Sequence, residues 1–376
     1  MKRIAGLSMI LLLAACQPAK EVEIEAPAKQ AASPRNVILM IGDGMGLAQV
    51  SAALYSNNNR LNLERFPVVG FHKSYSGSDL ITDSAAGATA FACGVKTYNN
   101  AIGLGPDTLP CITILEEASL QGLATGIVVT STVTHATPAA FVAHQPLRIL
   151  YENIAVDIAE SNIDLIIGGG KTYFYNRRMD RRNLLAEMSD RGFLILDNVP
   201  SPRSKIDASR RLAVFTAEDQ PPHVNQGRDY LPYASLFAAE FLSKKSDKGF
   251  FLMIEGSQID WAAHSNNERD MIKETLDFDR AVGMILDFAR KRGDTLVIVT
   301  ADHETGGASI VDGSKINRLD MKFTTNGHTA SLVPVYAYGP DSESFSGIYE
   351  NTDIYYKMKA ALNLGAGRES TSIKGE

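Results

Sequence analysis

The segment Val37-Ile38-Leu39-Met40-Ile41 decides the fold, because an uninterrupted apolar run indicates a buried strand, and Gly42-Asp43-Gly44 then ends it in a tight turn. A strand of this kind is covered on both faces, as in a parallel sheet between two layers of helices. Similar runs recur at residues 126–130, 163–167, 250–254, 296–300 and 333–337. Helical patterns lie between several of them, the clearest at residues 267–290. This alternation predicts an α/β fold, a three-layer sandwich with a central, mostly parallel sheet.

Two parts of this pattern carry more specific expectations. Pro334 has no backbone N–H, so it predicts an edge strand or the start of a strand. The polar stretch at residues 171–228 predicts irregular structure on the rim of the sheet. Ligands of α/β sheets bind beyond the carboxyl ends of the strands, so the residues directly after each strand are the first candidates for chemistry.

The first residues are typical of an export signal. Lys2 and Arg3 precede an apolar run that is too short to span a bilayer. The run ends in Leu13-Ala14-Ala15-Cys16, which resembles a bacterial lipobox and implies cleavage before Cys16 and diacylation of its thiol. The alternative is an ordinary secretory signal with a chance cysteine.

These features predict how the chain is divided. We expect a lipoprotein signal peptide at residues 1–15, a flexible tether at 16–34, one folded domain at 35–364 and a disordered tail at 365–376. Gln17 after the lipid-bearing cysteine favours the outer membrane, so the expected location is periplasmic and lipid-anchored.

Composition limits the partners and the redox chemistry. The formal net charge is −6 and no block of basic residues occurs, which argues against a nucleic-acid partner. Cys93 and Cys111 remain after Cys16, and an oxidising location permits a bridge between them. Two cysteines do not make a disulfide framework, and Cys93 follows an Ala-rich helix, so we predict a buried thiol.

The stretch Thr82-Asp83-Ser84-Ala85-Ala86-Gly87-Ala88-Thr89-Ala90 places a hydroxyl at the start of a helix. Small residues after Ser84 favour the helix, and Gly87 allows close packing. Asp83 or Ser84 would lie near the N-cap, where free N–H groups and the positive end of the helix dipole attract an anion. The alternative is an ordinary capping serine. A free hydroxyl is a weak nucleophile, so a catalytic Ser84 needs an activating group.

Carboxylate and imidazole side chains follow three predicted strands: Asp43, Glu255, Asp260, His264, Asp302 and His303. His328 precedes the last predicted strand. Asp260 and His264 are four residues apart, so on a helix they share a face and can hold one cation. Singly, Asp43 could be an ordinary turn residue, and Asp260 with His264 could be a chance pair. Asp302-His303 directly after a buried strand favours metal ligation, because burial of two ionisable groups is costly unless they are paired or bind metal. Together they form an oxygen and nitrogen set that suits zinc, and Glu255 suits magnesium. The set exceeds one tetrahedral ion, so we predict a metal pair that activates Ser84 for in-line phosphoryl transfer.

Arg148 lies just beyond the stretch at residues 134–144, which follows a predicted strand. A guanidinium can bond two phosphate oxygens at once, which a lysine cannot do. Without this context, Arg148 would be an ordinary surface arginine.

The motifs Gly-Asp-Gly, Asp-Ser-Ala, Ala-Thr-Pro-Ala-Ala, Glu-Gly-x-x-Ile-Asp-x-x-x-His, Ala-Asp-His and Gly-His-Thr occur in this order over almost the whole domain. With these motifs the chain resembles the alkaline phosphatases. The resemblance implies the alkaline phosphatase fold and metal-dependent hydrolysis of phosphate monoesters through a phosphoserine intermediate, with release of inorganic phosphate and an alcohol.

The resemblance also implies a role for each candidate residue. Ser84 would be the nucleophile, and Arg148 would bind the substrate phosphate. Two zinc ions and one magnesium ion per chain are implied. The first zinc would be held by Asp260, His264 and His328. The second zinc would be held by Asp43, Asp302 and His303, with Ser84 completing the site. Magnesium would be held by Asp43, Thr137 and Glu255.

Two positions that vary within the family carry His135 and Trp261 here, where some relatives have Asp beside magnesium and Lys near phosphate. Imidazole is a better ligand for zinc than for magnesium, so we expect the third site either to accept zinc or to hold magnesium loosely. Both residues are expected to border the substrate, and the missing lysine charge predicts weaker retention of phosphate.

The stretch at residues 304–326 is short beside relatives that carry a large crown insertion, which puts their extra metal sites and dimer contacts in doubt here. Family members are mostly dimers, so a homodimer is a possible assembly. We interpret His72 and His144 as structural and His223 as a surface residue.

Three other functions were weighed against this one. A sulfatase of the same superfamily would need a Cys-x-Pro-x-Arg motif, and neither Cys93 nor Cys111 lies in one. A phosphodiesterase or nucleotide pyrophosphatase is closer but usually carries threonine as its nucleophile. A non-catalytic zinc-binding lipoprotein would require neither Ser84 nor Arg148.

Overall fold

The computed structural model describes residues 31–201 and 206–365. The expected signal peptide, the expected lipid site at Cys16, most of the expected tether and the expected tail from residue 366 lie outside these residues.

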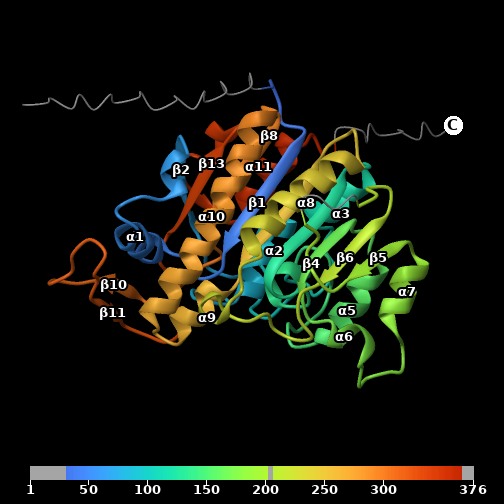
Figure 1. Cartoon of the computed structure of the whole chain (residues 1–376), viewed down its shortest axis with the longest axis horizontal. Helices are drawn as coiled ribbons and strands as arrows, with labels where there is room; N and C mark the ends of the chain where they lie inside the picture. Colours follow the sequence, from blue (N-terminus) through green and yellow to red (C-terminus); the bar gives the residue numbers. More distant parts are fainter. Residues whose placement is uncertain (1–30, 202–205, 366–376) are drawn as a thin grey trace, which may run out of the picture.

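A ten-stranded sheet runs through the molecule in the order β14-β2-β13-β8-β1-β7-β3-β4-β6-β5 (Figure 1). Its strands are β1 (Asn36–Gly42), β2 (Val68–Lys73), β3 (Ala124–Thr132), β4 (Leu165–Gly169), β5 (Phe193–Leu196), β6 (Arg211–Phe215), β7 (Phe250–Gly256), β8 (Thr295–Thr300), β13 (Val333–Tyr338) and β14 (Gly347–Glu350). Neighbouring strands pair in parallel except β13, which is antiparallel to both β2 and β8. The predicted α/β fold with a mostly parallel sheet is therefore confirmed.

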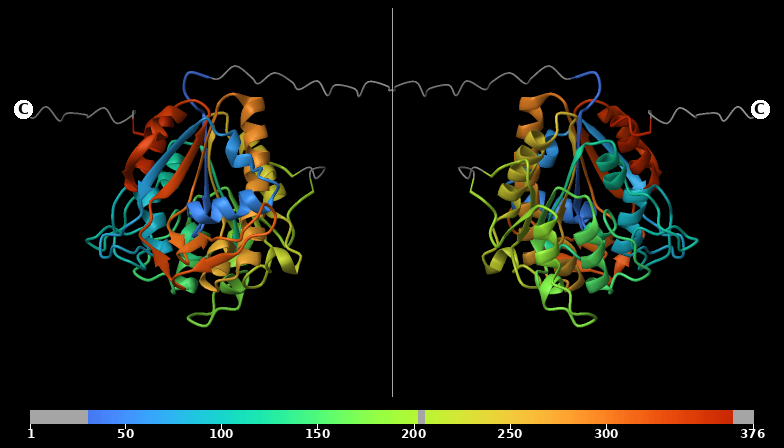
Figure 2. Two further views of the ribbon diagram at one scale, coloured as in Figure 1. Left: turned by 90° about the vertical axis from the view of Figure 1, so that its left-hand side faces the viewer. Right: turned by 90° about the vertical axis from the view of Figure 1, so that its right-hand side faces the viewer.

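Helices cover both faces of this sheet, which makes the three layers. One face carries α2 (Ser84–Cys93), α3 (Ile114–Leu120), α4 (Ala136–Ala139), α5 (Tyr151–Glu160), α6 (Thr172–Tyr175), α7 (Leu184–Asp190) and α11 (Thr352–Ala361). The other face carries α1 (Leu47–Ser56), α8 (Leu231–Lys245), α9 (Gln258–His264) and α10 (Glu268–Arg292). Figure 2 shows α10 in orange and α11 in red on opposite sides of the strands.

The alternation of β1 explains why both faces are apolar. Val37, Leu39 and Ile41 pack into one hydrophobic cluster, whereas Ile38 and Met40 pack into the other. Because successive side chains of a strand point to opposite faces, an uninterrupted apolar run fills two cores at once.

One prediction about this sheet needs correction. Residues 171–228 are not irregular throughout, because they contain α6, α7, β5 and β6, and the two short strands β5 and β6 extend the sheet at this edge. Pro334 lies near the start of β13, as predicted, but β13 is an interior strand that pairs on both sides. The predicted helix at residues 267–290 is confirmed as α10, which ends where Gly293 adopts a positive φ of 72°.

Two small two-stranded sheets lie outside the main sheet. β10 (Ala308–Ile310) pairs with β11 (Met321–Phe323), and β9 (Glu304–Thr305) pairs with β12 (His328–Thr329). The second pair brings His328 back to the end of β8.

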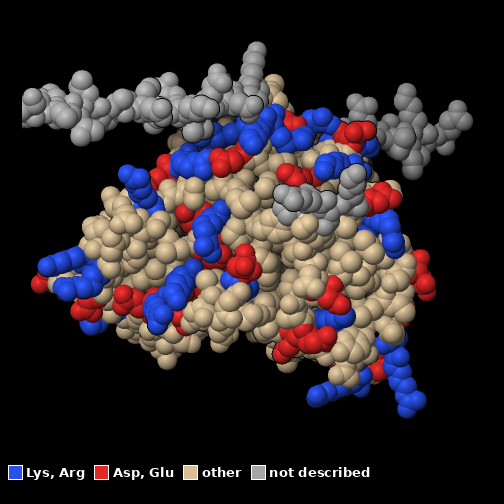
Figure 3. Space-filling model, in the orientation of Figure 1, with Lys and Arg blue, Asp and Glu red and all other residues tan. Residues whose placement is uncertain are grey.

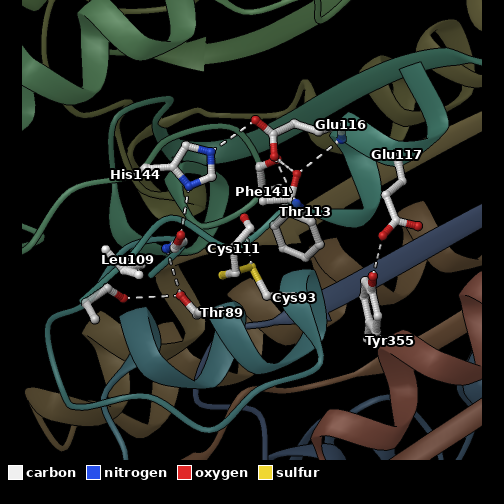
Figure 4. Close-up of a disulfide and its surroundings, with 12 residues drawn as sticks. Thr89, Cys93, Leu109, Cys111, Thr113, Glu116, Glu117, Phe141, His144 and Tyr355 are labelled. Atoms are coloured by element: carbon white, nitrogen blue, oxygen red, sulfur yellow. Dashed lines mark hydrogen bonds and ion pairs between the residues drawn. A yellow bond between two sulfur atoms is a disulfide. The ribbon is translucent and has the colours of Figure 1, made fainter. Parts of the chain in front are cut away.

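The two cysteines of the domain form a disulfide, so the prediction of a free buried thiol is wrong (Figure 4). Cys93 is the last residue of α2, and Gly94 then reverses the chain with a φ of 71°. The following loop returns to α2 and places the Cα of Cys111 at 5.9 Å from that of Cys93, across a sequence separation of 18. Pairing therefore depends on the path of this loop rather than on the burial of Cys93.

Charges of both signs are interspersed on the face of the molecule shown in Figure 3. This distribution agrees with the absence of a basic block in the sequence. Within the described ranges, none of the helices has the length and apolar character required to cross a bilayer.

Replacing Cys93 and Cys111 together by serine is expected to lower the free energy of unfolding by about 3 kcal/mol, because the bridge restricts the unfolded chain over a loop of this length. Urea unfolding of the oxidised protein, with and without reductant, measures the effect. The double variant is the control, because reductant should leave it unchanged. Equal midpoints for the wild-type protein under both conditions would contradict the bond.

Candidate active site

The predicted site residues gather beyond the carboxyl ends of four adjacent strands, β8, β1, β7 and β3. Asp302 and His303 follow β8, Asp43 follows β1, Glu255 lies near the end of β7, and Thr137 lies in α4 just beyond β3. These four strands are parallel to one another, so their ends meet at one edge of the sheet.

Ser84 is the first residue of α2, and Asp83, one of the two predicted candidates, is its N-cap. The Asp83 carboxylate accepts a hydrogen bond from the Ala86 N–H at 3.0 Å. A Cβ on Gly87 would lie 3.1 Å from the Cβ of Asp302, so this glycine lets α2 approach the end of β8. The nearly buried Ser84 hydroxyl thus lies at the positive end of a helix and beside the carboxylates of the sheet.

Three sets of side chains each bring potential metal-ligand atoms within 4.8 Å of one another. We call them metal group 1 (Asp260, His264 and His328), metal group 2 (Asp43, Asp302 and His303) and metal group 3 (Asp43, His135 and Glu255). Asp43 belongs to two of the groups.

Metal group 2 converges on the Nε2 atom of His303. This atom lies 3.5 Å from Asp43 Oδ1 and 3.3 Å from Asp302 Oδ2. It also lies 3.3 Å from Ser84 Oγ. All four side chains are buried, so the Ser84 hydroxyl lies beside metal group 2, where the resemblance predicts it.

Metal group 1 is held by α9 and β12. Asp260 and His264 share a face of α9, and His264 Nε2 lies 3.3 Å from Asp260 Oδ2. His328 Nε2 lies 3.0 Å from His264 Nε2 and 3.6 Å from Asp260 Oδ1. The other ring nitrogen of His328 bonds the Thr82 carbonyl at 2.8 Å, which ties this group to the loop that carries Ser84.

Metal group 3 consists mainly of buried polar atoms that lack hydrogen-bond partners. Both carboxylate oxygens of Asp43 and of Glu255 are in this state, as are His135 Nδ1 and Thr137 Oγ1. Buried polar groups without partners are costly and rare. A cation bound among them would satisfy these atoms, so metal group 3, with Thr137 beside it, fits a metal.

The pKa values show how much negative charge this edge of the sheet concentrates. Burial, followed by the charges of Asp302 and Asp260, raises the pKa of Asp43 well above its usual value. Burial raises the pKa of Glu255 to about 8. Burial, followed by the charge of Asp260, raises the pKa of Asp302 to about 6. Adjacent divalent cations would keep these carboxyl groups ionised at neutral pH.

Arg148 and Trp261 border this cluster. The Arg148 guanidinium donates from Nη1 to Asp83 Oδ2 at 3.0 Å, so the N-cap of α2 also fixes the arginine. The ring of Trp261 meets the ring of His135 edge-on, with centroids 5.7 Å apart. The ring of His223 also meets the ring of Trp261 edge-on, with centroids 6.2 Å apart. The prediction of His223 as a simple surface residue is therefore incomplete.

The interpretation of His72 and His144 as structural agrees with their contacts. His72 is fully buried in β2, and its Nε2 lies 2.8 Å from the Ala301 carbonyl. His144 Nδ1 lies 2.7 Å from the Gly103 carbonyl, and its Nε2 lies 3.0 Å from Glu116 Oε1 (Figure 4).

Two residues beside the metal groups were not identified from the sequence. Asp83 was expected only as a cap, although it also orients Arg148. Thr305 was not singled out, although its hydroxyl donates to Asp260 Oδ1 at 2.5 Å. The available signal was its position two residues after His303 at the end of a buried strand.

Comparison with known proteins identifies relatives of this arrangement. Residues 34–320 and 311–364 match the family described as alkaline phosphatase. Alkaline phosphatase 3 of Bacillus subtilis (strain 168) is 35% identical over 87% of this chain and 89% of its own length.

Solved structures show the same similarity. The alkaline phosphatase from the Antarctic bacterium TAB5 shares 43% identity with a TM-score of 0.83, over 89% of this chain and 99% of that chain. A variant of the TAB5 enzyme, in which a histidine is replaced by aspartate, has magnesium bound in its M3 site. That structure shares 44% identity with a TM-score of 0.82, over the same shares of both chains.

Replacing Asp43 by asparagine is expected to weaken metal groups 2 and 3 together, because Asp43 offers an oxygen to both. Glu255→Gln is the matched control and should weaken metal group 3 alone. Elemental analysis after dialysis against fixed free zinc and magnesium should show two ions lost in the first variant and one in the second. Loss of the same number of ions in both variants would contradict the shared position of Asp43.

Proposed function

The chain belongs to the alkaline phosphatase family and is an enzyme that hydrolyses phosphate monoesters, and from this premise we propose that Ser84 is its nucleophile and forms a phosphoserine intermediate. The observation that carries the proposal is the position of Ser84 Oγ. It lies 3.3 Å from His303 Nε2, beside metal group 2 and at the N-terminus of α2.

The residues of the chain give each part of the substrate a place. The N-terminus of α2 attracts the phosphate through its free N–H groups and its dipole. Arg148 uses one nitrogen to bond Asp83 and retains further N–H groups for two phosphate oxygens. The phosphorus is then held in front of Ser84 Oγ, so positioning and neutralisation of charge account for much of the catalysis.

Two in-line displacements complete the reaction. Ser84 Oγ attacks phosphorus as the bond from phosphorus to the alcohol oxygen breaks, which leaves phosphoserine and the alcohol. A water molecule then displaces Ser84 Oγ, which releases inorganic phosphate, restores the hydroxyl and retains configuration at phosphorus. Zinc held by metal groups 1 and 2 supplies the positive charge that lowers the pKa of a bound hydroxyl and stabilises the leaving alkoxide.

We assign zinc to metal groups 1 and 2 because each combines imidazole with carboxylate. Metal group 3, with Thr137, has two carboxylates and suits magnesium, but the imidazole of His135 favours zinc. The third site therefore either accepts zinc or holds magnesium loosely. Trp261 brings no positive charge to the neighbourhood of the phosphate, so the product is released more readily than a lysine would allow.

We also propose where the protein is located in the cell and how it is anchored there. Cleavage before Cys16 and diacylation of its thiol would anchor the enzyme in the periplasm at the outer membrane, with small phosphate monoesters as substrates. A homodimer is the possible assembly. Radiolabelled palmitate incorporation into the wild-type protein, but not into Cys16→Ser, would support the anchor.

Replacing Ser84 by alanine is expected to lower kcat for p-nitrophenyl phosphate by more than about 10⁴-fold, because the covalent route requires the hydroxyl. Ser235→Ala is the matched control, since Ser235 is a buried serine that bonds only its own helix backbone in α8. Zinc content should remain near that of the wild type in both variants. Near-normal turnover by Ser84→Ala would reject the covalent mechanism.

Replacing His135 by aspartate is expected to tighten magnesium binding at metal group 3 by about tenfold or more, because a carboxylate replaces an imidazole beside two other carboxylates. His135→Asn is the control, because it removes the imidazole without adding charge. Magnesium titration of the zinc-loaded protein, followed by calorimetry and by phosphatase activity, measures the effect. Unchanged magnesium affinity in His135→Asp would contradict the assignment.

A further inference from the structure

Thr305 lies between the two zinc groups and touches both. It is fully buried in β9, where it pairs with His328 of β12. Its N–H donates to the Gly44 carbonyl at 3.2 Å. Its backbone is therefore fixed to the turn after β1 on one side and to the strand of His328 on the other.

The Thr305 hydroxyl has two polar neighbours and a single proton. Its oxygen lies 2.5 Å from Asp260 Oδ1 of metal group 1 and 3.2 Å from His303 Nδ1 of metal group 2. An ionised carboxylate can only accept hydrogen bonds, so the hydroxyl proton points to Asp260. The hydroxyl oxygen can then only accept from the histidine, which requires a proton on Nδ1.

This assignment fixes which nitrogen of His303 is available to a metal. With the proton on Nδ1, the lone pair of the neutral ring is on Nε2. Nε2 is the atom that faces Ser84 Oγ and the carboxylates of Asp43 and Asp302. A single hydroxyl thus orients a ligand of each zinc group and selects the tautomer of one of them.

We propose that Thr305 is a positioning residue that couples the two zinc groups through its shared hydroxyl, an inference that rests on the proposed function. The local sequence supports it. A Cβ at position 44 would lie 2.7 Å from Thr305 Oγ1 and 2.9 Å from Asp260 Oδ1, so Gly44 leaves space for the contact. Gly44 also has a positive φ of 68°, which glycine adopts without strain.

The pair of strands β9 and β12, which carries Thr305, is also held by contacts of Glu304. The Glu304 carboxylate is nearly buried and accepts from Gln49 Nε2 at 2.9 Å and from the N–H groups of Gly307 and Ala308 at 3.2 Å each. It also accepts from the Thr329 hydroxyl, beside His328. Removal of the Thr305 hydroxyl should therefore leave strands β9 and β12 paired. The side chains of Asp260 and His303 would lose their shared hydrogen-bond partner.

The test replaces Thr305 by valine, which keeps the shape, and by serine, which keeps the hydroxyl. Thr275→Val is the matched control, because Thr275 is a buried threonine that bonds only its own helix in α10. Zinc affinity is measured by competition with a chromogenic chelator. The coordination geometry is read from the visible spectrum of the cobalt-substituted protein, and urea unfolding of the metal-free protein reports stability.

In Thr305→Val, we expect both zinc ions to bind about 10- to 100-fold more weakly and the cobalt spectrum to change, because second-shell partners of metal ligands have effects of this size. Thr305→Ser should keep the zinc affinity and the cobalt spectrum of the wild type, and Thr275→Val should change neither. The metal-free forms of the Thr305 variants should unfold at similar urea concentrations. Should the valine variant not fold, Thr305→Ala removes the hydroxyl without adding a methyl group beside Asp260.

Unchanged zinc affinity and an unchanged cobalt spectrum in a folded valine or alanine variant would overturn the proposal, as would weakening at one zinc group alone. A wild-type protein that binds no zinc would instead overturn the proposed function on which it rests.

Discussion

Four carboxylates are buried close together at one edge of the sheet, and the repulsion among their charges constrains the rest of the structure. Asp43, Glu255, Asp260 and Asp302 are each at most 5% exposed, and metal groups 1 to 3 bring them together. Burial of one such group is already costly, and several negative charges so close can be retained only with compensating positive charge. Imidazole side chains lie beside these carboxylates. Oxygens of Asp43, Glu255 and Asp302 that lack hydrogen-bond partners are available to bind cations.

The rest of the fold places the hydroxyl of Ser84 against this cluster. Parallel strands bring the carboxylates to one edge, and the small residues of α2 allow that helix to approach it. The same helix offers its positive end to an anion and carries Asp83, which orients Arg148. At its other end, the bond between Cys93 and Cys111 fixes the loop that returns to α2. Under the proposed function, different parts of one scaffold would therefore draw substrate phosphate and metal ions to one place.

Much of this arrangement could be predicted because it depends on local sequence. Ser84 follows an N-cap, Asp260 and His264 share one face of a short helix, and Asp43 follows an apolar strand. Each of these relations is set within a few residues, and the mostly parallel pairing of the sheet follows from the alternation of strands and helices.

What the sequence did not reveal depends on contacts between distant segments. The bond between Cys93 and Cys111 follows from the path of a loop, and the contact of His223 with Trp261 joins a loop to α9. The short strand β5 at Phe193–Leu196 was hidden within a polar region, although its own residues are apolar. Apart from its position two residues after His303, nothing in the local sequence distinguishes Thr305 from other threonines. Its hydroxyl gains two partners because the pairing of β9 with β12 and the turn at Gly44 fix its backbone between them.

We propose that the buried carboxylates and imidazoles hold paired cations beside Ser84. Anomalous X-ray diffraction at the zinc absorption edge, from crystals grown with zinc and inorganic phosphate, can locate these cations. We expect two zinc peaks about 4 Å apart, one in metal group 1 and one in metal group 2, with phosphate between Ser84 and Arg148. Zinc peaks elsewhere, or their absence from both groups at saturating zinc, would contradict it.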